Sequence, residues 1–570
     1  MKLPLSKPLI GLSGLAALLF ATTALAGEIA GTVQSAQGKA MAGIRVQITD
    51  LMRSTSTDTE GKFHFNWLPE GSIAVDVSSP FYASQREVLQ VPREGTVEVA
   101  FALASNTELA RAAALRSEPK VEHAAQKQAY LSLVEKSARD QKAMKKFPNI
   151  VVILFDDLGY GDISSFGNKL IATPHIDALA RRGAKLTQSY SASPVCTPSR
   201  AGLMTGRLPV RSSAANHVFF PTGHPVATMR RSLGWANALP RDEITLAEVL
   251  SHAGYATGAF GKWHLGDVKG SRPNDLGFQS YFGVHYSNDM APLAIYRDEQ
   301  IDTPVPNVRQ ETLNVQFADE AINFIRKNKD RPFFAYVPFT GPHWPHHPPA
   351  NRTGKSAGGH YGDVVEDLDD QVGRIVSALD TLDIADETII VVTSDNGGDY
   401  DGAVGDLRGR KGETWEGGMR VPQFIAWPGV TKPGTTIDAM TMNIDLFPSL
   451  LAMRGIPLPS DRIIDGRDIR SMLSGATPSP HQYLYYLTTW TAEVSAVRNA
   501  KYKYREPVDD TSPLGGAGKA LHPAPALYDL EKDNEAHNVI NRHPEVTEDL
   551  KRQIAALRAE IENNRRGWKM

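Results

Sequence analysis

The sequence predicts an α/β protein: a large, mostly parallel sheet flanked by helices, with a small β-sandwich domain before it and a small antiparallel sheet near the C-terminus. Two continuous apolar runs rich in β-branched residues, Asn149–Phe155 and Thr388–Thr393, are typical of parallel strands buried on both faces. Helical patterns at Glu243–Ala253 and Val364–Leu379 lie between these runs. A chain of 570 residues is long enough for two or three domains.

The chain opens with the pattern of an export signal. Positive charges near the start precede the apolar run Leu9–Ala21, and small residues at Ala24–Ala26 offer a cleavage site, which predicts a signal peptide at residues 1–26. The alternative is a membrane anchor, but this apolar run is too short to span a bilayer. No later segment is apolar enough to span one. We therefore expect an exported protein, periplasmic or secreted.

The charge pattern excludes some partners. The net charge is −3, and 22 % of the residues are charged, without a block of like charges. Such a chain lacks the basic patches that bind nucleic acid or an acidic membrane surface. We expect no nucleic-acid partner.

Residues 27–104 predict a small β-sandwich. Short alternating runs are separated by Gly, Pro and Asp turns, as in packed antiparallel sheets. The runs are Gly31–Val33, Ile44–Ile48, Lys62–Phe65, Ile73–Val77 and Val97–Phe101. The order of the stretches GKAMAGIRVQITD, TDTEGKFHFNWLPEG and VDVSSPFY resembles the carboxypeptidase-regulatory-like, transthyretin-type domain. That resemblance implies an accessory module, and these residues hold no catalytic constellation.

Two further stretches complete the expected domain organisation. Residues 105–147 are rich in Ala, Glu, Lys and Gln and nearly free of Gly and Pro, which predicts a helical linker. Residues 148–570 form the α/β domain, with a small C-terminal subdomain from about residue 440. Within this subdomain Val497–Tyr504 predicts an antiparallel strand. A closing amphipathic helix is predicted by the apolar residues Val546, Leu550, Ile554, Leu557 and Ile561.

Cys196 is the only cysteine in the sequence and begins the run Cys-Thr-Pro-Ser-Arg. In an exported protein a lone thiol has no intramolecular disulfide partner, so it is either a buried relic or part of the chemistry. Thr197 can cap a helix, Pro198 suits its first position, and we expect the helix to stop at Gly206. Residue 196 would then lie beside helix N-terminal amides with Arg200 one turn in, a place that favours an anion.

Oxygen ligands gather where two of the predicted strands end. Asp156 and Asp157 directly follow the first apolar run, and Asp395 and Asn396 follow the second. In open α/β sheets the site lies beyond the carboxyl ends of the strands. Three carboxylates and an amide oxygen suit a hard divalent cation, Ca²⁺ or Mg²⁺, better than zinc. The alternative makes the acidic pair a helix cap and the Ser-Asp-Asn-Gly-Gly stretch a plain turn.

Cationic side chains follow or flank other predicted elements. Lys262 and His264 come after the strand-like stretch Tyr255–Phe260, and Lys411 lies in a Gly-rich loop. Each could be structural, since lysines are usually solvated and single histidines often belong to the core. Together with the cysteine and the oxygen ligands, however, they describe a site for a tetrahedral oxyanion, whose charge a metal and cations would neutralise.

Three histidines follow the strand-like stretch Phe333–Val337. They are His343, His346 and His347, interleaved with prolines. This group could also suggest zinc. The prolines prevent the helical histidine pair that zinc sites favour, and no cysteine cluster lies nearby.

Six motifs then follow one another in a single order. They are NIVVILFDDLGYGD, CTPSRAGLMTGR, GKWHLG, PHWP, TSDNGG and KGETWEGGMRVP. The cysteine-containing motif resembles the signature of type I sulfatases, the arylsulfatase family of the alkaline phosphatase superfamily, and the other five resemble the remaining motifs of that family. The resemblance spans about residues 148–545, and its segment ALYDLEKDNEAHN is typical of the small C-terminal sheet of that family.

The resemblance implies a modified residue at position 196. In type I sulfatases a dedicated maturation enzyme converts the cysteine of a Cys-X-Pro-X-Arg sequence to Cα-formylglycine, and Cys196 to Arg200 fit that sequence. The hydrated aldehyde would attack sulfur, and Arg200 would steady it. Because a geminal diol can leave as an aldehyde, the covalent sulfate ester breaks by C–O cleavage, an exit that serine and unmodified cysteine lack.

The resemblance also implies roles for the other candidates. The ligands of one Ca²⁺ would be Asp156, Asp157, Asp395, Asn396 and the modified Cys196. Lys262 and Lys411 would bind sulfate oxygens. His343, with Lys411, would protonate the leaving alcohol. His264 would take a proton from the other hydroxyl of the diol and so expel sulfate.

Further residues are expected to contact the substrate. The stretch Tyr286–Asp289 resembles a loop of the arylsulfatase A-like branch whose serine contacts sulfate, which implies Ser287. His346 and His347 stand where many close relatives have Leu-Gln, and we expect them to line the pocket of the leaving group. Substrate preference therefore cannot be copied from a relative.

The expected activity is that of a sulfuric ester hydrolase that releases inorganic sulfate outside the cytoplasm. Sulfated glycans are found there, so a sulfated carbohydrate is the expected substrate. A sulfated small molecule is the alternative substrate. One alternative is a phosphonate or phosphodiester hydrolase of the same superfamily. Another is a non-catalytic protein that binds sulfated glycans.

Overall fold

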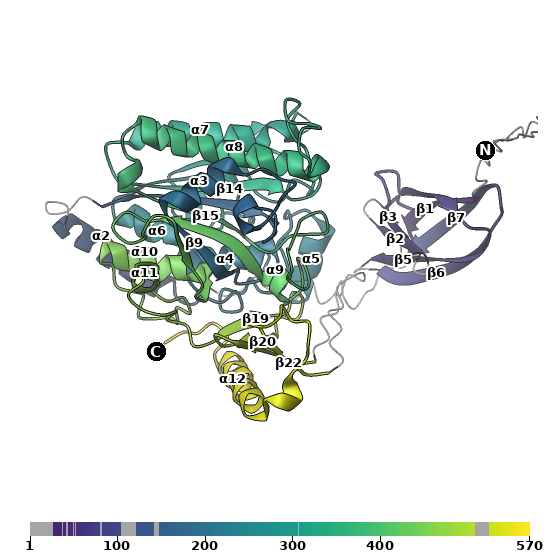
Figure 1. Cartoon of the computed structure of the whole chain (residues 1–570). Coiled ribbons are helices and arrows are strands. Elements are labelled where there is room, and N and C mark those ends of the chain that lie inside the picture. The colour runs from purple at the N-terminus through teal and green to yellow at the C-terminus, as the bar shows by residue number, and fades with distance from the viewer. Residues whose placement is uncertain are drawn as a thin grey trace, which may run out of the picture. The chain divides into compact units, whose positions relative to one another are not determined.

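The computed structural model describes residues 27–103, 121–141, 147–305, 307–507 and 524–569, apart from positions 37, 42–43, 49–50, 52 and 80–81. The chain divides into two compact units, Met1–Ala110 and Arg111–Met570. Figure 1 shows the helices and strands of each. The expected signal peptide at residues 1–26 and two parts of the expected linker, residues 105–120 and 142–146, lie outside the described residues.

The first unit is a two-sheet β-sandwich, as predicted. Its described strands are β1 Gly27–Ser35, β2 Arg45–Ile48, β3 Arg53–Ser56, β4 Lys62–Leu68, β5 Gly71–Ser79, β6 Tyr82–Val91 and β7 Gly95–Leu103. One sheet has the order β4-β1-β7 and the other β3-β2-β5-β6. Side chains alternate along β1, so that Ile29 and Val33 pack with Phe65 and Val75 in the core. All five predicted runs form strands, and the structure adds β3 and β6.

The second unit is built on a large sheet of eleven strands in the described part of the chain. The strands are β8 Asn149–Asp156, β9 Ala184–Tyr190, β10 Ala256–Lys262, β11 Ser280–Val284, β12 Ile295–Arg297, β13 Gln300–Thr303, β14 Phe333–Pro342, β15 Thr388–Ser394, β16 Arg420–Ala426, β17 Thr435–Ile437 and β18 Thr441–Met442. Their order is β13-β12-β11-β10-β14-β8-β15-β16-β9-β17, with β18 paired to β9. The run β11-β10-β14-β8-β15 is parallel throughout, while β16 is antiparallel to both its neighbours.

The sequence of β8 explains its place in the centre of this sheet. Ile150, Val152 and Leu154 enter the core on one face of the sheet. Val151 and Ile153 enter the core on the other face. Because both faces of the strand are covered, every position from Ile150 to Phe155 is apolar, and the alternation of a half-exposed strand is absent.

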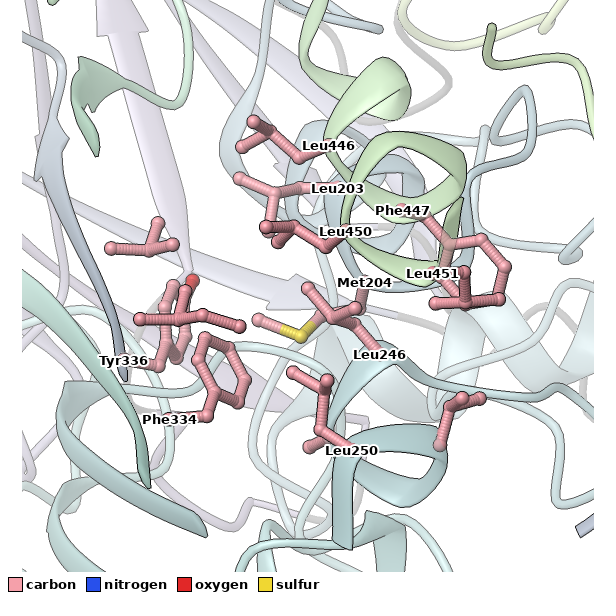
Figure 2. Close-up of a cluster of buried hydrophobic side chains, with 14 of the residues drawn as sticks. Leu203, Met204, Leu246, Leu250, Phe334, Tyr336, Leu446, Phe447, Leu450 and Leu451 are labelled. Carbon is pink, nitrogen blue, oxygen red and sulfur yellow. The ribbon is translucent and has the colours of Figure 1, made fainter. Parts of the chain in front are cut away.

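Helices cover both faces of the sheet (Figure 1). The helices α3 Pro174–Arg182, α7 Leu313–Asn328 and α8 Gly359–Thr381 contribute to the core on one face. The helices α2 Ala124–Gln141, α4 Cys196–Thr205, α6 Leu246–His252 and α10 Leu446–Arg454 contribute to the core on the other. The other helices before the C-terminal sheet are α5 Pro225–Ser232, α9 Glu416–Met419 and α11 Arg470–Leu473. In Figure 2 the side chains of Leu203 and Met204 from α4 lie among leucines of α6 and α10, which anchors the helix that begins at Cys196.

Two predicted helices of this unit are confirmed, one of them with shorter bounds. The pattern at residues 364–379 lies inside α8. The pattern at 243–253 becomes α6, which starts later because Thr245 caps it. The hydroxyl of Thr245 accepts from the backbone N–H of Glu248 at 3.1 Å, and the Glu248 carboxylate accepts from the N–H of Thr245 at 3.0 Å.

The start of α4 differs from the prediction by two residues. The helix begins at Cys196 with Val195 as its N-cap, so Thr197 is not the cap. The hydroxyl of Thr197 is instead used in tertiary contacts: it donates to the carbonyl of His264 at 2.9 Å and accepts from the N–H of Phe219 at 3.0 Å. The predicted stop is confirmed, since Gly206 ends the helix with φ of 69°.

A small antiparallel sheet and a closing helix form the C-terminal part, as predicted. The elements are β19 Leu484–Leu487, β20 Val494–Arg498, β21 Tyr502–Arg505, β22 Ala526–Asp529 and α12 Pro544–Asn563. The prediction of one strand over residues 497–504 is wrong, because this stretch is a hairpin of β20 and β21. The side chain of Asn499 accepts from the N–H groups of Lys501 and Tyr502, at 2.9 and 2.7 Å, and so forms the turn.

Trp568 anchors the C-terminal end of the chain to the second unit. Its ring stacks on His123 with 4.0 Å between centroids, and its Nε1 donates to the carboxylate of Glu122 at 2.8 Å. Three guanidinium groups lie within 4.6 to 5.1 Å of the ring centroid, those of Arg207, Arg462 and Arg566. Replacement of Trp568 by alanine should therefore lower the free energy of unfolding by about 2 to 4 kcal/mol.

Chemical denaturation measures this loss. The variant Trp568→Phe, which keeps a ring against the arginines, should retain most of the stability. Equal losses in the two variants would contradict the assigned role of the ring.

No described helix has both the length and the apolar character needed to cross a bilayer.

Candidate active site

The carboxyl ends of four parallel strands bring the predicted site together. Asp156 is the last residue of β8 and Lys262 the last of β10, while Asp395 directly follows β15 and His343 directly follows β14. Cys196 enters from the start of α4. The strands that carry these residues are neighbours in the sheet, which is why residues far apart in sequence meet here.

Buried oxygen atoms surround Cys196. One atom each from Asp156, Asp157, Asp395 and Cys196 lie within 4.8 Å of one another. The fourth predicted oxygen ligand, Asn396, donates from Nδ2 to Asp157 Oδ1 at 2.8 Å. Its Oδ1 is buried and has no hydrogen-bond partner among the described residues. A buried amide oxygen without a donor, beside three carboxylates, is the donor set that a hard divalent cation requires.

Burial, more than mutual repulsion, opposes the ionisation of these carboxylates. Burial raises the pKa of Asp395 to about 7, although the charge of Arg200 opposes the rise. Burial also acts to raise the pKa of Asp156, but the nearby charges of Lys262, His343 and Arg200 hold it well below its usual range. A dipositive ion would remove the repulsion between these groups and favour the ionised form of each.

Three cations face these carboxylates: Lys262 and Arg200 are fully buried, and Lys411 is half-buried. Lys262 Nζ lies 2.6 Å from Asp156 Oδ2, and Lys411 Nζ lies 2.5 Å from Asp157 Oδ2. Arg200 Nε donates to Asp395 Oδ2 at 2.8 Å. The predicted Ser287 belongs to this group as well. It is fully buried, and its hydroxyl accepts from Lys262 Nζ at 3.1 Å. The site therefore combines a concentrated negative charge with fixed positive groups that suit an anionic substrate.

Cys196 is 1 % exposed and lies against this cluster. Its Sγ is 3.2 Å from Asp156 Oδ1 and 3.9 Å from Asp157 Oδ1. Burial, together with the charge of Asp156, raises the pKa of the thiol well above its usual value. Because the thiolate is the reactive form of cysteine, an unmodified thiol in these surroundings is a weak nucleophile.

The two histidines implied as proton carriers have defined tautomers. His264 Nε2 must donate to the carbonyl of Phe219 at 3.0 Å, which leaves Nδ1 as an acceptor, and Nδ1 is buried without a partner among the described residues. Burial and the charge of Lys262 lower the pKa of His264 far below its usual value, so the ring is neutral. His343 Nδ1 donates to the carbonyl of Trp344, and Nε2 lies 3.6 Å from Asp157 Oδ2.

The other two predicted histidines lie away from the cysteine. His346 Nε2 is 3.9 Å from a carboxylate oxygen of Asp401, and its ring contacts the edge of Tyr361. His347 is exposed. Among the described residues, no group of potential metal ligands contains more than one histidine. The geometry therefore gives no support to zinc held by His343, His346 and His347.

An aromatic wall beside the cysteine was not predicted. Val218 packs with Cys196, and Phe220 packs against this pair. His217 stacks on Trp490 with 3.8 Å between ring centroids and has a positive φ of 58°, which is uncommon for a residue with a side chain. Burial lowers the pKa of His217, and the positive charge of Lys411 lowers it further. These residues occur in stretches without a recognisable pattern, so no signal in the sequence pointed to them.

Comparison with known protein families matches three regions of the chain. Residues 148–456 match the Sulfatase family. Residues 28–104 match the Carboxypeptidase regulatory-like domain, and residues 411–560 match the N-sulphoglucosamine sulphohydrolase C-terminal family. The chain is therefore a sulfatase preceded by a carboxypeptidase regulatory-like domain, as the motifs indicated.

Curated relatives agree with this. The chain is 34 % identical to human arylsulfatase A over 468 residues, which cover 74 % of this chain and 89 % of the relative. It is 32 % identical to rat steryl-sulfatase, with 73 % and 89 % covered. It is 34 % identical to canine N-acetylgalactosamine-6-sulfatase, with 60 % and 68 % covered.

Solved structures agree as well. A Bacteroides thetaiotaomicron structure described under the metabolism of multiple glycosaminoglycans matches with a TM-score of 0.66 and 28 % identity, covering 73 % of this chain and 100 % of its own. A sulfatase from Pseudoalteromonas sp. matches with a TM-score of 0.65 and 26 % identity, covering 78 % and 96 %. The chain belongs to the sulfatase family and is a sulfuric ester hydrolase.

Proposed function

We propose that this enzyme releases inorganic sulfate from a sulfated carbohydrate through a formylglycine at position 196, with Ca²⁺ as its metal. The observation that carries the proposal is the place of Cys196: it starts a buried helix within a Cys-X-Pro-X-Arg sequence, between a cluster of carboxylates and a set of cations. A maturation enzyme is then a required partner. When present, a hydrated aldehyde at residue 196 supplies a hydroxyl that attacks sulfur and a route by which the bound group is released.

The ion would be held by Asp156, Asp157, Asp395, Asn396 and residue 196. Calcium is favoured over magnesium because the site offers several carboxylates and an amide oxygen in a dry protein cage, whereas magnesium usually keeps several waters. When bound, the metal neutralises charge on the sulfate group. The residues around it do the remaining work: Lys262 and Lys411 contact sulfate oxygens, with Ser287 beside them, and Arg200 holds Asp395 in place.

Chelation tests the choice of metal. Removing divalent cations should abolish sulfate release and lower the melting temperature, because the buried carboxylates then repel one another with only the three cations to compensate. Re-addition of Ca²⁺ should restore both, and Mg²⁺ should restore less of each. Full recovery of melting temperature and activity with Mg²⁺ but not with Ca²⁺ would show that the metal is wrongly assigned.

Proton transfer is assigned to two histidines. His343 Nε2 faces Asp157 near Lys411, so we propose that His343 and Lys411 protonate the leaving alcohol. The free Nδ1 of neutral His264 suits the removal of a proton. The neutral base, His264, and the acid, His343, follow different strands, so the two proton transfers can occur in turn.

His343 should matter most for poor leaving groups. The variant His343→Ala should lower kcat/KM for an alkyl or sugar sulfate by about 10²- to 10⁴-fold, since such alcohols must be protonated as they leave. The loss with 4-nitrophenyl sulfate, which leaves as a stable anion, should be much smaller. Steady-state kinetics on both substrates gives the ratio, and His537→Ala, whose side chain is 81 % exposed, serves as the control. Equal losses on both substrates would argue against the acid role.

Three observations support a carbohydrate substrate. Structures similar to this chain include one described with glycosaminoglycan metabolism and one in complex with k-i-k-neocarrahexaose, the latter with a TM-score of 0.63 and 27 % identity. The aromatic wall places the half-buried rings of Phe220 and His217 beside the reaction centre, with Trp490 buried behind His217, and such rings suit the face of a sugar. The export signal expected at residues 1–26 would bring the enzyme to the compartment where such glycans occur.

A substrate panel tests this proposal. Matured enzyme should release sulfate from sulfated oligosaccharides faster than from a steroid sulfate, and faster by orders of magnitude than it cleaves a phosphodiester. A preference for the steroid ester would contradict the carbohydrate assignment alone. A preference for the phosphodiester would contradict the reaction class.

We also propose the domain organisation expected from the sequence. Residues 1–26 are removed on export, 27–104 form an accessory sandwich, 105–147 link it, and 148–570 form the sulfatase domain with its C-terminal subdomain from about residue 440. Deleting residues 27–104 should leave turnover of small esters unchanged. An N-terminal sequence of the exported protein that does not start near Gly27 would contradict the first boundary.

A further inference from the structure

A cavity open to solvent lies beside the loop that follows His264 and takes no part in the chemistry above. Its walls come from the end of α5 and the turn after it, from residues 237–241, and from the turn 268–271. The charged and aromatic side chains on these walls are Arg231, Arg241, Lys269 and Trp235. Among the described residues that line the cavity, none is acidic. The lining is therefore cationic.

The charges of these three cations are not neutralised by partners in the fold. Arg231 Nη2 donates to the carbonyl of Thr222 at 3.3 Å and to the hydroxyl of Thr228 at 3.2 Å. Arg241 donates to the carbonyl of Lys269. Over the residues that the structure describes, none of the three forms an ion pair, and each acceptor is uncharged. Their positive charge remains available to an anionic ligand.

The nearby carboxylates are already engaged. Asp267 accepts from the backbone N–H of Thr222 at 2.9 Å. Asp275 accepts from the backbone N–H of Gly270 at 2.6 Å. Neither carboxylate lines the cavity.

The aromatic ring narrows the class of ligand. Trp235 is half-buried and lines the same cavity as the cations. A free inorganic anion gains nothing from an indole ring, whereas the apolar face of a sugar can pack on it while guanidinium groups bind its sulfate oxygens in a fork. A sulfated sugar fits both features.

The walls of the cavity are hydrogen-bonded to the segments that carry the reaction centre. The N–H of Leu239 donates to the carbonyl of Leu265, next to His264, at 2.8 Å. The side chain of Asn237 accepts from the N–H of Phe220 at 3.1 Å and donates to its carbonyl at 2.7 Å. The cavity is thus one layer of backbone away from His264 and from the aromatic wall.

We propose that this cavity is an additional subsite of the enzyme, which binds a sulfate-bearing sugar of an oligosaccharide while another sulfate ester of the same chain occupies the reaction centre. The proposal rests on the proposed carbohydrate substrate. It predicts that affinity grows with chain length and with sulfation beyond the ester that is cleaved.

The test removes the cations without touching the reaction centre. The variant with Arg231→Ser, Arg241→Ser and Lys269→Ser should raise KM for a sulfated hexasaccharide by about tenfold to a hundredfold, with kcat changed less than twofold. For 4-nitrophenyl sulfate both constants should stay at the wild-type values. A matched variant with Lys327→Ser, Lys329→Ser and Lys432→Ser removes the same charge from positions outside the cavity and should behave as wild type.

Two results would overturn the subsite. One is an unchanged KM for the hexasaccharide in the cavity variant, and the other is an equal rise in the matched control, which would reveal a general effect of charge. If the triple variant folds poorly, Lys269→Ser alone still removes an unpaired cation from the cavity wall and should raise KM about threefold.

A binding titration separates failure of the subsite from failure of the proposed function. In the Cys196→Ala background, hexasaccharides of chondroitin sulfate and of carrageenan are titrated beside their desulfated forms. At least one sulfated form should bind, and the cavity variant should weaken it. If the wild type released no sulfate from any glycan while this binding persisted, the substrate assignment would fail and the subsite would stand. Equal binding of sulfated and desulfated forms, or competition by inorganic sulfate alone, would overturn the subsite.

Discussion

Replacement of Cys196 by alanine is expected to abolish sulfate release, lowering kcat/KM by at least about 10⁴-fold. The other four metal ligands and the cations would remain, so substrate would still bind. What the variant lacks is the precursor of the attacking group, whose sulfur lies 3.2 Å from Asp156 in the native site. KM or a dissociation constant for the substrate should therefore change much less than kcat.

Two controls distinguish loss of chemistry from loss of structure. The melting temperature of Cys196→Ala should stay close to that of the wild type, because the side chain fills a small volume beside Val218. Wild-type protein made without the maturation enzyme should be as inactive as the alanine variant, since its buried thiol is protonated. Substantial turnover in either preparation would contradict a mechanism through formylglycine.

Replacement of Asp395 by alanine should have the next largest effect, on both activity and stability. Asp395 Oδ2 pairs with the fully buried Arg200, and Oδ1 accepts from the backbone N–H of Asp157 at 3.2 Å. Removal of the carboxylate leaves the buried guanidinium with only the more distant Asp156, 3.4 Å away, which costs about 3 to 5 kcal/mol of stability. Loss of a metal ligand as well should reduce kcat by more than about 10³-fold.

The matched variant Asp395→Asn separates these two effects. It keeps the size of the side chain and an acceptor for Arg200, so we expect a smaller loss of stability than in the alanine variant, with a comparable loss of activity. Denaturant titration and metal content measure the two quantities. An asparagine variant that binds Ca²⁺ and turns over like the wild type would show that Asp395 serves Arg200 alone.

The strands that position the site were predictable because a strand buried on both faces has a continuous run of apolar residues. The runs at 149–155 and 388–393 became β8 and β15, whose side chains enter the cores on both faces of the sheet. The rule that sites lie at the carboxyl ends of parallel strands then placed Asp156 and Asp395 together. Their proximity follows from the order of the strands in the sheet, so local sequence patterns were enough to predict that they lie together.

Features that depend on tertiary contacts were not predictable. Thr197 is of a residue type that often caps helices. Its hydroxyl instead forms hydrogen bonds with the backbone of His264 and Phe219, which are distant in sequence. The turn at Asn499 divides a stretch whose β-branched and aromatic residues otherwise suit one strand. The aromatic wall at His217 and Trp490 joins two unrelated loops, and no periodicity connects them.

The most direct test of the central claim is the mass of the peptide that contains residue 196, taken from enzyme made with increasing amounts of the maturation enzyme. The account predicts that the peptide loses its sulfur and gains an aldehyde that reacts with hydrazine probes. It also predicts that kcat per molecule rises in proportion to the fraction converted. Fully active enzyme in which the Cys196 peptide still carries an intact thiol would contradict it.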